Sequence, residues 1–197
     1  TYELDIEGAV ELLEEDGWTL GPDGENYDAE KGTARCKEID GERVALELKL
    51  LCPEGSVIDG ALEENFTANL KEAGILLSLD VLPMQELLTY YYRLQDRDYD
   101  MISLATNFDV VFEPSVYFLP DSEGAINHYN TTGIQDDLLY KALIDMRTTE
   151  SHDVLGYAAK WVAFQEMFQE YVPMIPLYSN VYFDFYPRVL HDYEING

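Results

Sequence analysis

The hydrophobic period of this chain switches repeatedly between helical and strand spacing, and this switching constrains its fold more than any other feature. Residues 33–39, 43–51, 75–82 and 99–105 have the alternation or the short apolar runs that are typical of strands. Five other segments carry apolar stripes at helical spacing: Ile6, Ala9, Val10 and Leu13; Ile58, Leu62, Phe66, Leu70 and Ala73; Met84, Leu87, Leu88 and Tyr91; Leu138, Leu139, Ala142, Leu143 and Met146; Val154, Leu155, Ala158, Trp161, Val162, Gln165 and Phe168. Strands and helices in this order predict a single α/β domain with a mixed sheet flanked by helices.

The first two strands are expected to form a hairpin. Asp40-Gly41 lies between them and is a favoured two-residue hairpin turn. The second strand is expected to continue into the core, so that one sheet contains residues 44–51, 75–82 and 99–105. The aromatic tail over residues 175–186 is expected to be strand-like, and its apolar strip to favour self-association.

The charge balance excludes one class of partner. The 197 residues include 39 Asp and Glu against 12 Lys and Arg, which gives a net charge of −27. A nucleic acid or an anionic membrane would be repelled by such a surface, so we expect no nucleic-acid partner. No apolar run approaches the roughly 20 residues of a membrane helix, and any secretion signal is expected to lie outside this sequence.

No motif supports catalysis, a metal site or a cofactor. The chain lacks a phosphate-binding glycine loop, a metalloprotease motif and a nucleophile elbow, and its three histidines, His128, His152 and His191, are isolated. We therefore expect no enzyme activity, no bound metal and no cofactor. Cys36 and Cys52 leave two alternatives open, a pair of partly buried thiols or a disulfide bridge, and the thiols are favoured.

The long aromatic segment over residues 106–134 is the strongest candidate for a binding site. Loops of this length are usually functional or disordered, and this one is too rich in aromatic residues for disorder. It follows a predicted buried strand, and α/β sheets bind ligands outside the carboxyl ends of their strands. The candidate ligand-binding residues are Asn107, Phe108, Asp109 and Phe112; an ordinary ordered loop is the alternative.

Five short motifs, in the same order along the chain, resemble those of the family 5 extracellular solute-binding proteins, the oligopeptide-, dipeptide- and nickel-binding components of ABC importers. The pieces are the A-x-x-L-L-x-x-x-G-W helix at residues 9–18, the L-x-x-x-G-I helix end at 70–75, the strand entry at 99–101, N-H-Y-N at 127–130 followed by D-L-L at 137–139, and V-P-M-I-P-L-Y at 172–178.

The resemblance implies one lobe of a type II periplasmic-binding-protein fold. Residues 1–197 would be the C-terminal ligand-binding lobe of a two-lobed receptor whose N-terminal lobe is missing here. The implied partners are a peptide or other small solute, the permease subunits of an ABC importer and the missing lobe. The implied location is outside the cytoplasm, either periplasmic or on the cell surface as a lipoprotein.

The sequence departs from the family's peptide-binding pattern, G-W-x-x-D-x-x-D-P, in which the first Asp can pair with a peptide's amino terminus. Counting back from Pro114 places Asn107 at the Trp position and Val110 at that Asp position, with Asp109 one residue away. Sugars, nickel chelates and other small solutes therefore stay open as ligands. The alternative function is an acidic glycan-acting or protein-recognition module, which would need two facing carboxylates about 5 to 10 Å apart.

Overall fold

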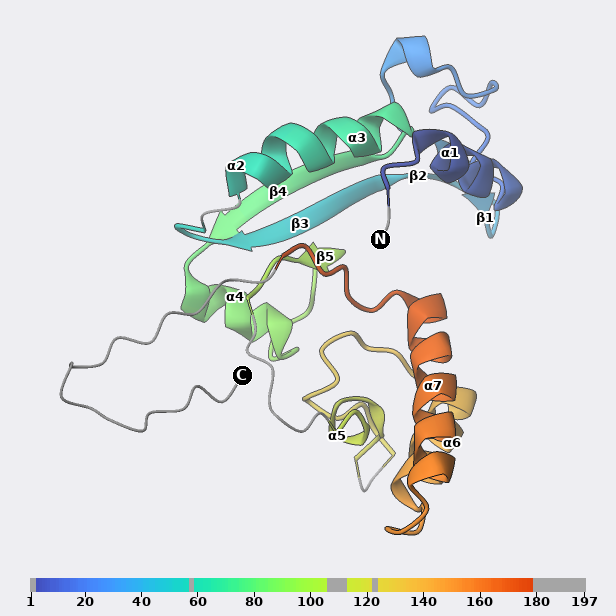
Figure 1. The fold of residues 1–197 in the computed structure, drawn as a ribbon. Coiled ribbons are helices and arrows are strands. Elements are labelled where there is room, and N and C mark those ends of the chain that lie inside the picture. Colours follow the sequence, from blue (N-terminus) through green and yellow to red (C-terminus); the bar gives the residue numbers. More distant parts are fainter. Residues whose placement is uncertain (1–2, 57–58, 106–112, 122–123, 179–197) are drawn as a thin grey trace, which may run out of the picture. The chain divides into compact units, whose positions relative to one another are not determined.

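The computed structural model describes residues 3–56, 59–105, 113–121 and 124–178 (Figure 1). The chain divides into two compact units, residues 1–135 and 136–197. The first unit combines helices with parallel strands, and the described part of the second consists of two helices and an irregular segment. The predicted α/β class is confirmed by the first unit.

A parallel three-stranded sheet forms the centre of the first unit. The strand β3 (Glu47–Pro53) lies between β4 (Leu76–Leu82) and β5 (Met101–Ile102), and both neighbours run parallel to it. Leu50 of β3 is in register with Leu79 on one side and with Met101 on the other. The predicted third strand, residues 99–105, is reduced to the two residues of β5, although amide bonds from Asp100 to the Lys49 carbonyl and from Ser103 to the Leu51 carbonyl extend the pairing.

Both faces of β3 are buried, which explains its almost continuous apolar sequence. On one face Leu50 and Cys52 pack with Leu62 and Leu77 in a buried cluster. Leu51 of β3 points to the opposite face and is fully buried. The helix α4 (Met84–Tyr91) contacts β3, and its Leu87 is also fully buried. Figure 1 shows α3 and α4 on opposite sides of the sheet.

The helix over the first face includes a π-helical stretch. Its parts are α2 (Asp59–Ala61), the five-residue π-helix η2 (Leu62–Phe66) and α3 (Thr67–Glu72). The predicted stripe is confirmed where it is described, because Leu62 and Ala73 are buried and Phe66 and Leu70 pack against the buried cluster. Ile58, the first residue of that stripe, lies outside the described residues.

The predicted hairpin forms, but its second strand does not continue unbroken into the core. β1 (Cys36–Ile39) pairs antiparallel with β2 (Glu42–Ala45), and Asp40 and Gly41 both have the positive φ that a type I′ turn requires. Leu46 separates β2 from β3 and bonds to both neighbours, since its amide donates to the Arg35 carbonyl and its carbonyl accepts from the Leu76 amide. The expected single strand over residues 43–51 is therefore wrong: it is divided between two sheets.

The helix α1 (Ile6–Glu15) begins and ends as its sequence predicts. The Asp5 side chain accepts a hydrogen bond from the Gly8 amide at 2.8 Å, which is the usual N-cap arrangement. The predicted stripe of Ile6, Ala9, Val10 and Leu13 is only half-buried, and Leu12 is exposed. Within the first unit α1 is thus held less by burial than by the polar contacts described below.

The second unit packs α6 (Asp137–Arg147) beside α7 (Val154–Tyr171). Leu139, Leu143 and Met146 of α6 are buried as predicted, whereas Leu138 is exposed. Asp136 caps α6 by accepting a hydrogen bond from the Leu139 amide. This bond, with a further one from the Tyr171 hydroxyl, holds the pKa of the Asp136 carboxyl below its usual value.

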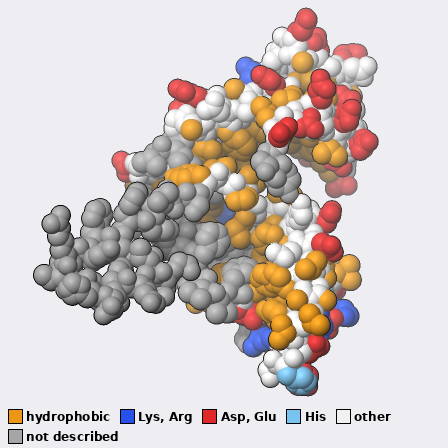
Figure 2. Space-filling model, viewed as in Figure 1, with side chains coloured by type: hydrophobic (Ala, Val, Ile, Leu, Met, Phe, Trp, Pro, Cys, Tyr) orange, Lys and Arg blue, Asp and Glu red, His pale blue; other side chains and the backbone are white. Residues whose placement is uncertain are grey.

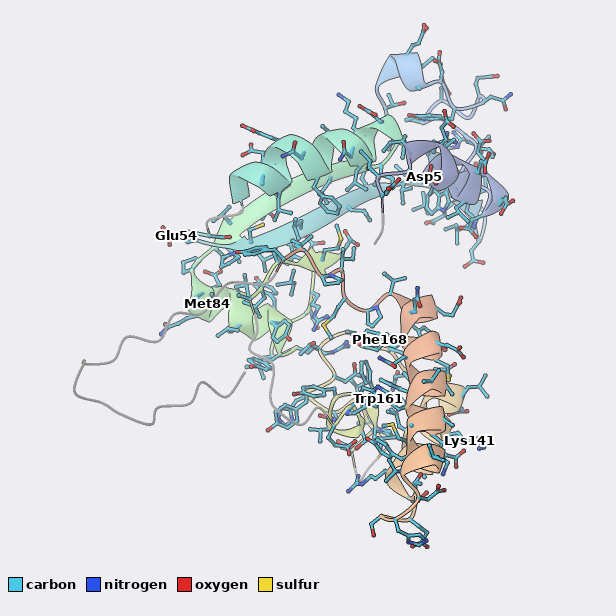
Figure 3. The ribbon with its side chains drawn as sticks, in the orientation of Figure 1. Asp5, Glu54, Met84, Lys141, Trp161 and Phe168 are labelled. Atoms are coloured by element: carbon cyan, nitrogen blue, oxygen red, sulfur yellow. The ribbon has the colours of Figure 1, made fainter. Side chains whose placement is uncertain are left out.

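The predicted buried stripe of α7 is wrong in part. Val154, Leu155, Ala158 and Val162 are exposed, while Phe164, which the stripe omits, is buried. The Phe164 ring lies 5.7 Å from the Trp161 ring and 5.8 Å from the Phe168 ring, so these aromatic residues define the inner face (Figure 3). Apolar residues surround α7, and the larger aromatic side chains bury more area than the aliphatic ones when they face inward.

The chain beyond α7 is irregular as far as it is described. Val172 has a left-handed backbone with a φ of 44°, and residues 173–178 form neither helix nor strand. Of the tail predicted to be strand-like, residues 175–178 are therefore not a strand. Residues 179–186, which include the aromatic part of that tail, lie outside the described residues.

One buried arginine joins the parts of the first unit. The Arg35 side chain donates from Nε to the Ala73 carbonyl at 2.9 Å and from Nη1 to the Trp18 carbonyl at 3.0 Å. It also pairs with Glu14 of α1 at 3.2 Å and lies 4.2 Å from the centre of the Tyr27 ring. Gly74, whose φ is 88°, allows this approach, because a Cβ there would lie 2.6 Å from Arg35 Cγ.

Cys36 and Cys52 are both buried and no disulfide joins them, so the structure decides for the favoured alternative, a pair of thiols. Burial raises the pKa of the Cys36 thiol. A raised pKa lowers the fraction of reactive thiolate at neutral pH. Cys36 therefore acts as a small core residue.

Replacing Arg35 with Met is expected to destabilise the protein by about 2–4 kcal/mol, because the buried Ala73 carbonyl and the partly buried Trp18 carbonyl lose their donor. Equilibrium urea unfolding measures the change. The matched control is Arg43→Met, which removes an exposed arginine and its surface ion pair with Glu38 and should cost about 1 kcal/mol or less. Equal effects of the two substitutions would contradict the role given to Arg35.

Candidate functional site

The carboxyl edge of the parallel sheet is the candidate functional site. β3, β4 and β5 run in the same direction, so Pro53, Leu82 and Ile102 end at the same edge. A hydrogen bond from the Glu54 amide to the Leu82 carbonyl, at 2.8 Å, holds the ends of β3 and β4 together. Another of 2.8 Å, from the Ser103 amide to the Leu51 carbonyl, holds β5. Sheets of this kind bind ligands outside this edge.

Three segments leave this edge and supply its side chains. Residues 54–56 follow β3, Met84 begins α4 one residue after Pro83, and residues 103–105 follow β5. Glu54 is exposed and Met84 is 46% exposed, and Figure 3 shows both at the same end of the sheet. The edge thus offers a carboxylate, which can pair with a cation or accept hydrogen bonds, and an adaptable apolar thioether.

All four predicted ligand-binding residues lie outside the described residues. Asn107, Phe108, Asp109 and Phe112 belong to residues 106–112, between Ala105 and Glu113. The structure describes what comes before them: Ser103, one residue after β5, is held at the carboxyl edge by its bond to Leu51. Their role as ligand contacts therefore stays a prediction.

Glu54 and Met84 are site candidates that the sequence-based prediction omitted. The rule about carboxyl ends was applied only to the third strand, although Pro53 and Pro83 mark the ends of the first two. The same rule, applied to every parallel strand, would have found both residues. The sequence predicted that the three strands share one sheet, but it did not show that all three run parallel with β3 in the centre.

The opposite end of the sheet has polar contacts that hold β5 in place. The Lys49 ammonium pairs with Asp98 at 2.6 Å, and this contact raises the pKa of Lys49. The Lys49 amide donates to the Asp100 carboxylate at 2.8 Å. The Tyr99 ring packs edge-on against Tyr90, with ring centres 5.2 Å apart, and burial raises the pKa of its hydroxyl. These contacts serve the fold rather than a ligand.

The N-H-Y-N segment at residues 127–130 has a structural role. The Asn127 amide nitrogen donates to the carbonyls of Val116 and Leu119, so this loop is fixed to the short helix α5 (Ser115–Phe118). The Asn130 side chain is 1% exposed. Its nitrogen donates to the Ile134 carbonyl, and its oxygen accepts from the Gly133 amide and the Thr132 hydroxyl.

Two further properties follow for the described residues alone. In that part of the chain, no group of three or more His, Cys, Asp or Glu side chains is arranged to hold a metal ion. None of the helices described is long and apolar enough to cross a membrane.

Comparison with solved structures confirms the predicted fold. The chain is similar to the oligopeptide binding protein of Thermus thermophilus complexed with a pentapeptide, with 21% identity, a TM-score of 0.69, and 88% of this chain and 29% of that chain covered. It is also similar to lactococcal OppA complexed with an endogenous peptide, with 23% identity, a TM-score of 0.62 and coverage of 86% and 29%. A third similar structure is NikZ from Campylobacter jejuni in complex with Ni(L-His), with 17% identity, a TM-score of 0.60, and 87% of this chain and 31% of that chain covered.

No family model matches the sequence, and no curated protein sequence matches it significantly. The chain spans less than one third of the length of the solved structures named above. The chain is also similar to the ABC transporter-associated periplasmic binding protein DppA from Helicobacter pylori in complex with the peptide STSA, with 17% identity, a TM-score of 0.59, and 87% of this chain and 28% of that chain covered. The described α/β architecture is therefore that of one lobe of a periplasmic binding protein.

Replacing Asn130 with Asp is expected to destabilise the protein by about 1–3 kcal/mol, because a buried carboxylate cannot donate to the Ile134 carbonyl. Thermal unfolding followed by circular dichroism measures the loss. Asn65→Asp, the same chemical change at an exposed position, is the control and should be nearly neutral. If Asn130→Asp were equally neutral, the Asn130 bonds would not fix this loop.

Proposed function

We propose that this chain is the C-terminal ligand-binding lobe of a larger solute receptor of the family 5 type, which delivers a peptide or other small solute to an ABC importer. The fold shared with receptors for oligopeptides and for a nickel complex supports this proposal. The receptor acts by binding and release and carries out no catalysis. Its place is outside the cytoplasm, in the periplasm or as a lipoprotein on the cell surface.

The observation that carries the proposal is the single edge at which all three parallel strands end. The segment with Asn107, Phe108, Asp109 and Phe112 begins four residues after β5, close in sequence to this edge. Glu54 and Met84 extend the proposed site across the ends of β3 and β4. Each contributes a different chemistry: an amide, aromatic rings, carboxylates and a thioether.

The exposed apolar side chains of the second unit support the proposal that this chain packs against another lobe. Leu155 of α7 is 84% exposed, and the run from Val172 to Tyr178 exposes five large apolar side chains. Figure 2 shows hydrophobic side chains gathered on the second unit. A run of exposed large apolar side chains such as residues 172–178 is typical of an interface with another protein or domain. We assign it to the first lobe of the same receptor, and the permease subunits of the importer are its further partners.

The ligand we propose is not a peptide held by its amino terminus at the family's usual position. Val110 stands where that carboxylate would be, and a buried ammonium without an anionic partner costs several kcal/mol. Asp109, one residue away in sequence, and Glu54, an exposed carboxylate directly after β3, are the alternatives we propose in this lobe. A solute with a cationic group would have to use one of them, whereas an uncharged solute would need neither.

Calorimetry on the full-length protein that contains this chain tests the proposal, first with a mixed peptide library and then with small solutes such as sugars and nickel chelates. We expect one solute to bind tightly. If that solute is cationic, Asp109→Asn should weaken binding about 10- to 100-fold, because a charge-assisted hydrogen bond is lost.

The matched control is Glu11→Gln, which removes one negative charge from an exposed position on α1. It should leave the affinity unchanged. Tight peptide binding that survives Asp109→Asn would place the anchor elsewhere, and failure of every solute to bind would overturn the receptor proposal.

A further inference from the structure

The helix α4 ends on an arginine in a backbone conformation that favours glycine. Arg93 has a φ of 58°, its amide donates to the Tyr90 carbonyl, and the Leu94 amide donates to the Thr89 carbonyl. This pair of bonds is the Schellman motif, whose left-handed position is usually Gly. A residue other than glycine in this conformation lowers the stability of the folded backbone, so the Arg93 side chain is retained at a cost in folding free energy.

The Arg93 guanidinium lies against a glycine of the loop organised by Asn130. A Cβ on Gly133 would be 2.2 Å from Arg93 Nη1, so the guanidinium lies against the backbone of this glycine. Lys31, Arg35, Lys37, Arg43, Lys49 and Lys141 each pair with a carboxylate. Within the described part of the chain, Arg93 has neither an ion pair nor a side-chain hydrogen bond.

Arg97 supplies a second cation at the same end of α4. Its Nε donates to the Tyr90 carbonyl at 2.9 Å and its Nη2 to the Tyr91 carbonyl at 2.8 Å, which fixes the guanidinium. Burial and the nearby charge of Arg93 lower the pKa of Arg97. The acidic neighbours in sequence are Asp96, which is exposed, and Asp98, which is paired with Lys49. In the described residues neither arginine forms an ion pair with a carboxylate.

Arg93 and Arg97 place two guanidiniums at one end of α4, and within the described residues neither has a carboxylate partner although the net charge of the chain is −27. Guanidinium groups bind planar and tetrahedral oxyanions through paired N–H donors, and an arginine held in place loses less entropy when it does so. We propose that Arg93 and Arg97, at the end of α4, bind a small oxyanion, either a phosphate group or the carboxylate of a solute. The proposal is independent of the site at the carboxyl edge.

The test uses thermal unfolding of the protein in sodium phosphate and in sodium acetate, each compared with sodium chloride at the same ionic strength and pH. This matching is required because screening alone is expected to stabilise so acidic a chain. We expect phosphate, acetate or both to raise the Tm by about 2 °C or more above the chloride value. Response to phosphate alone would indicate a phosphate group, and response to acetate a carboxylate.

The decisive variant is Arg93→Gly, which should fold at least as well as the parent because Gly suits the left-handed position. It is expected to lose the specific Tm increase. Arg147→Gln, which removes a positive charge from the last turn of α6, is the control and should keep the increase. An equal increase in Arg93→Gly, or no increase in the parent protein beyond chloride, would overturn the proposal.

Discussion

The contacts of the Arg35 guanidinium hold together the elements of the first unit that its small cores do not connect. The side chain bonds to the end of the helix before β4, to the Trp18 carbonyl and to Glu14 of α1, while its backbone amide donates to the Gly74 carbonyl and its carbonyl accepts from Leu46. Arg35 is 5% exposed, whereas the Glu14 side chain is 54% exposed. Most of its stabilising effect must therefore come from the neutral carbonyls it satisfies rather than from the ion pair.

The bonds around Arg35 and Leu46 lie directly before β3 and therefore determine where the parallel sheet begins. Leu46 connects the hairpin to β3 beside Arg35, and from there β3 extends with both faces covered by helices. A strand buried on both sides must pair on both edges as well, which β4 and β5 provide. The carboxyl ends of all three then reach one edge, and the proposed ligand site follows from this topology.

The sequence predicted the helices and strands of this fold better than it predicted which strands pair and which helix faces are buried. Helical spacing was sufficient to predict α1, α4 and α6, because the apolar period of each helix is a local feature of its sequence. Periodicity was insufficient at Leu46, where tertiary bonds to Arg35 and Leu76 divide an apparently continuous strand. It was also insufficient on α7, whose apolar residues surround the helix, so that only packing selects Phe164 as the inner residue. Glu54 and Met84 were omitted for a related reason, since strand adjacency is not encoded locally.

The central claim is that the carboxyl edge of this sheet meets a solute. Hydrogen–deuterium exchange of the full-length protein, with and without the solute that calorimetry identifies, tests it most directly. The account predicts slower exchange in peptides that cover residues 54–56, 83–84 and 103–113, and unchanged exchange over the β1–β2 hairpin, residues 36–45. Protection confined to the hairpin, with none at the ends of β3, β4 and β5, would contradict it.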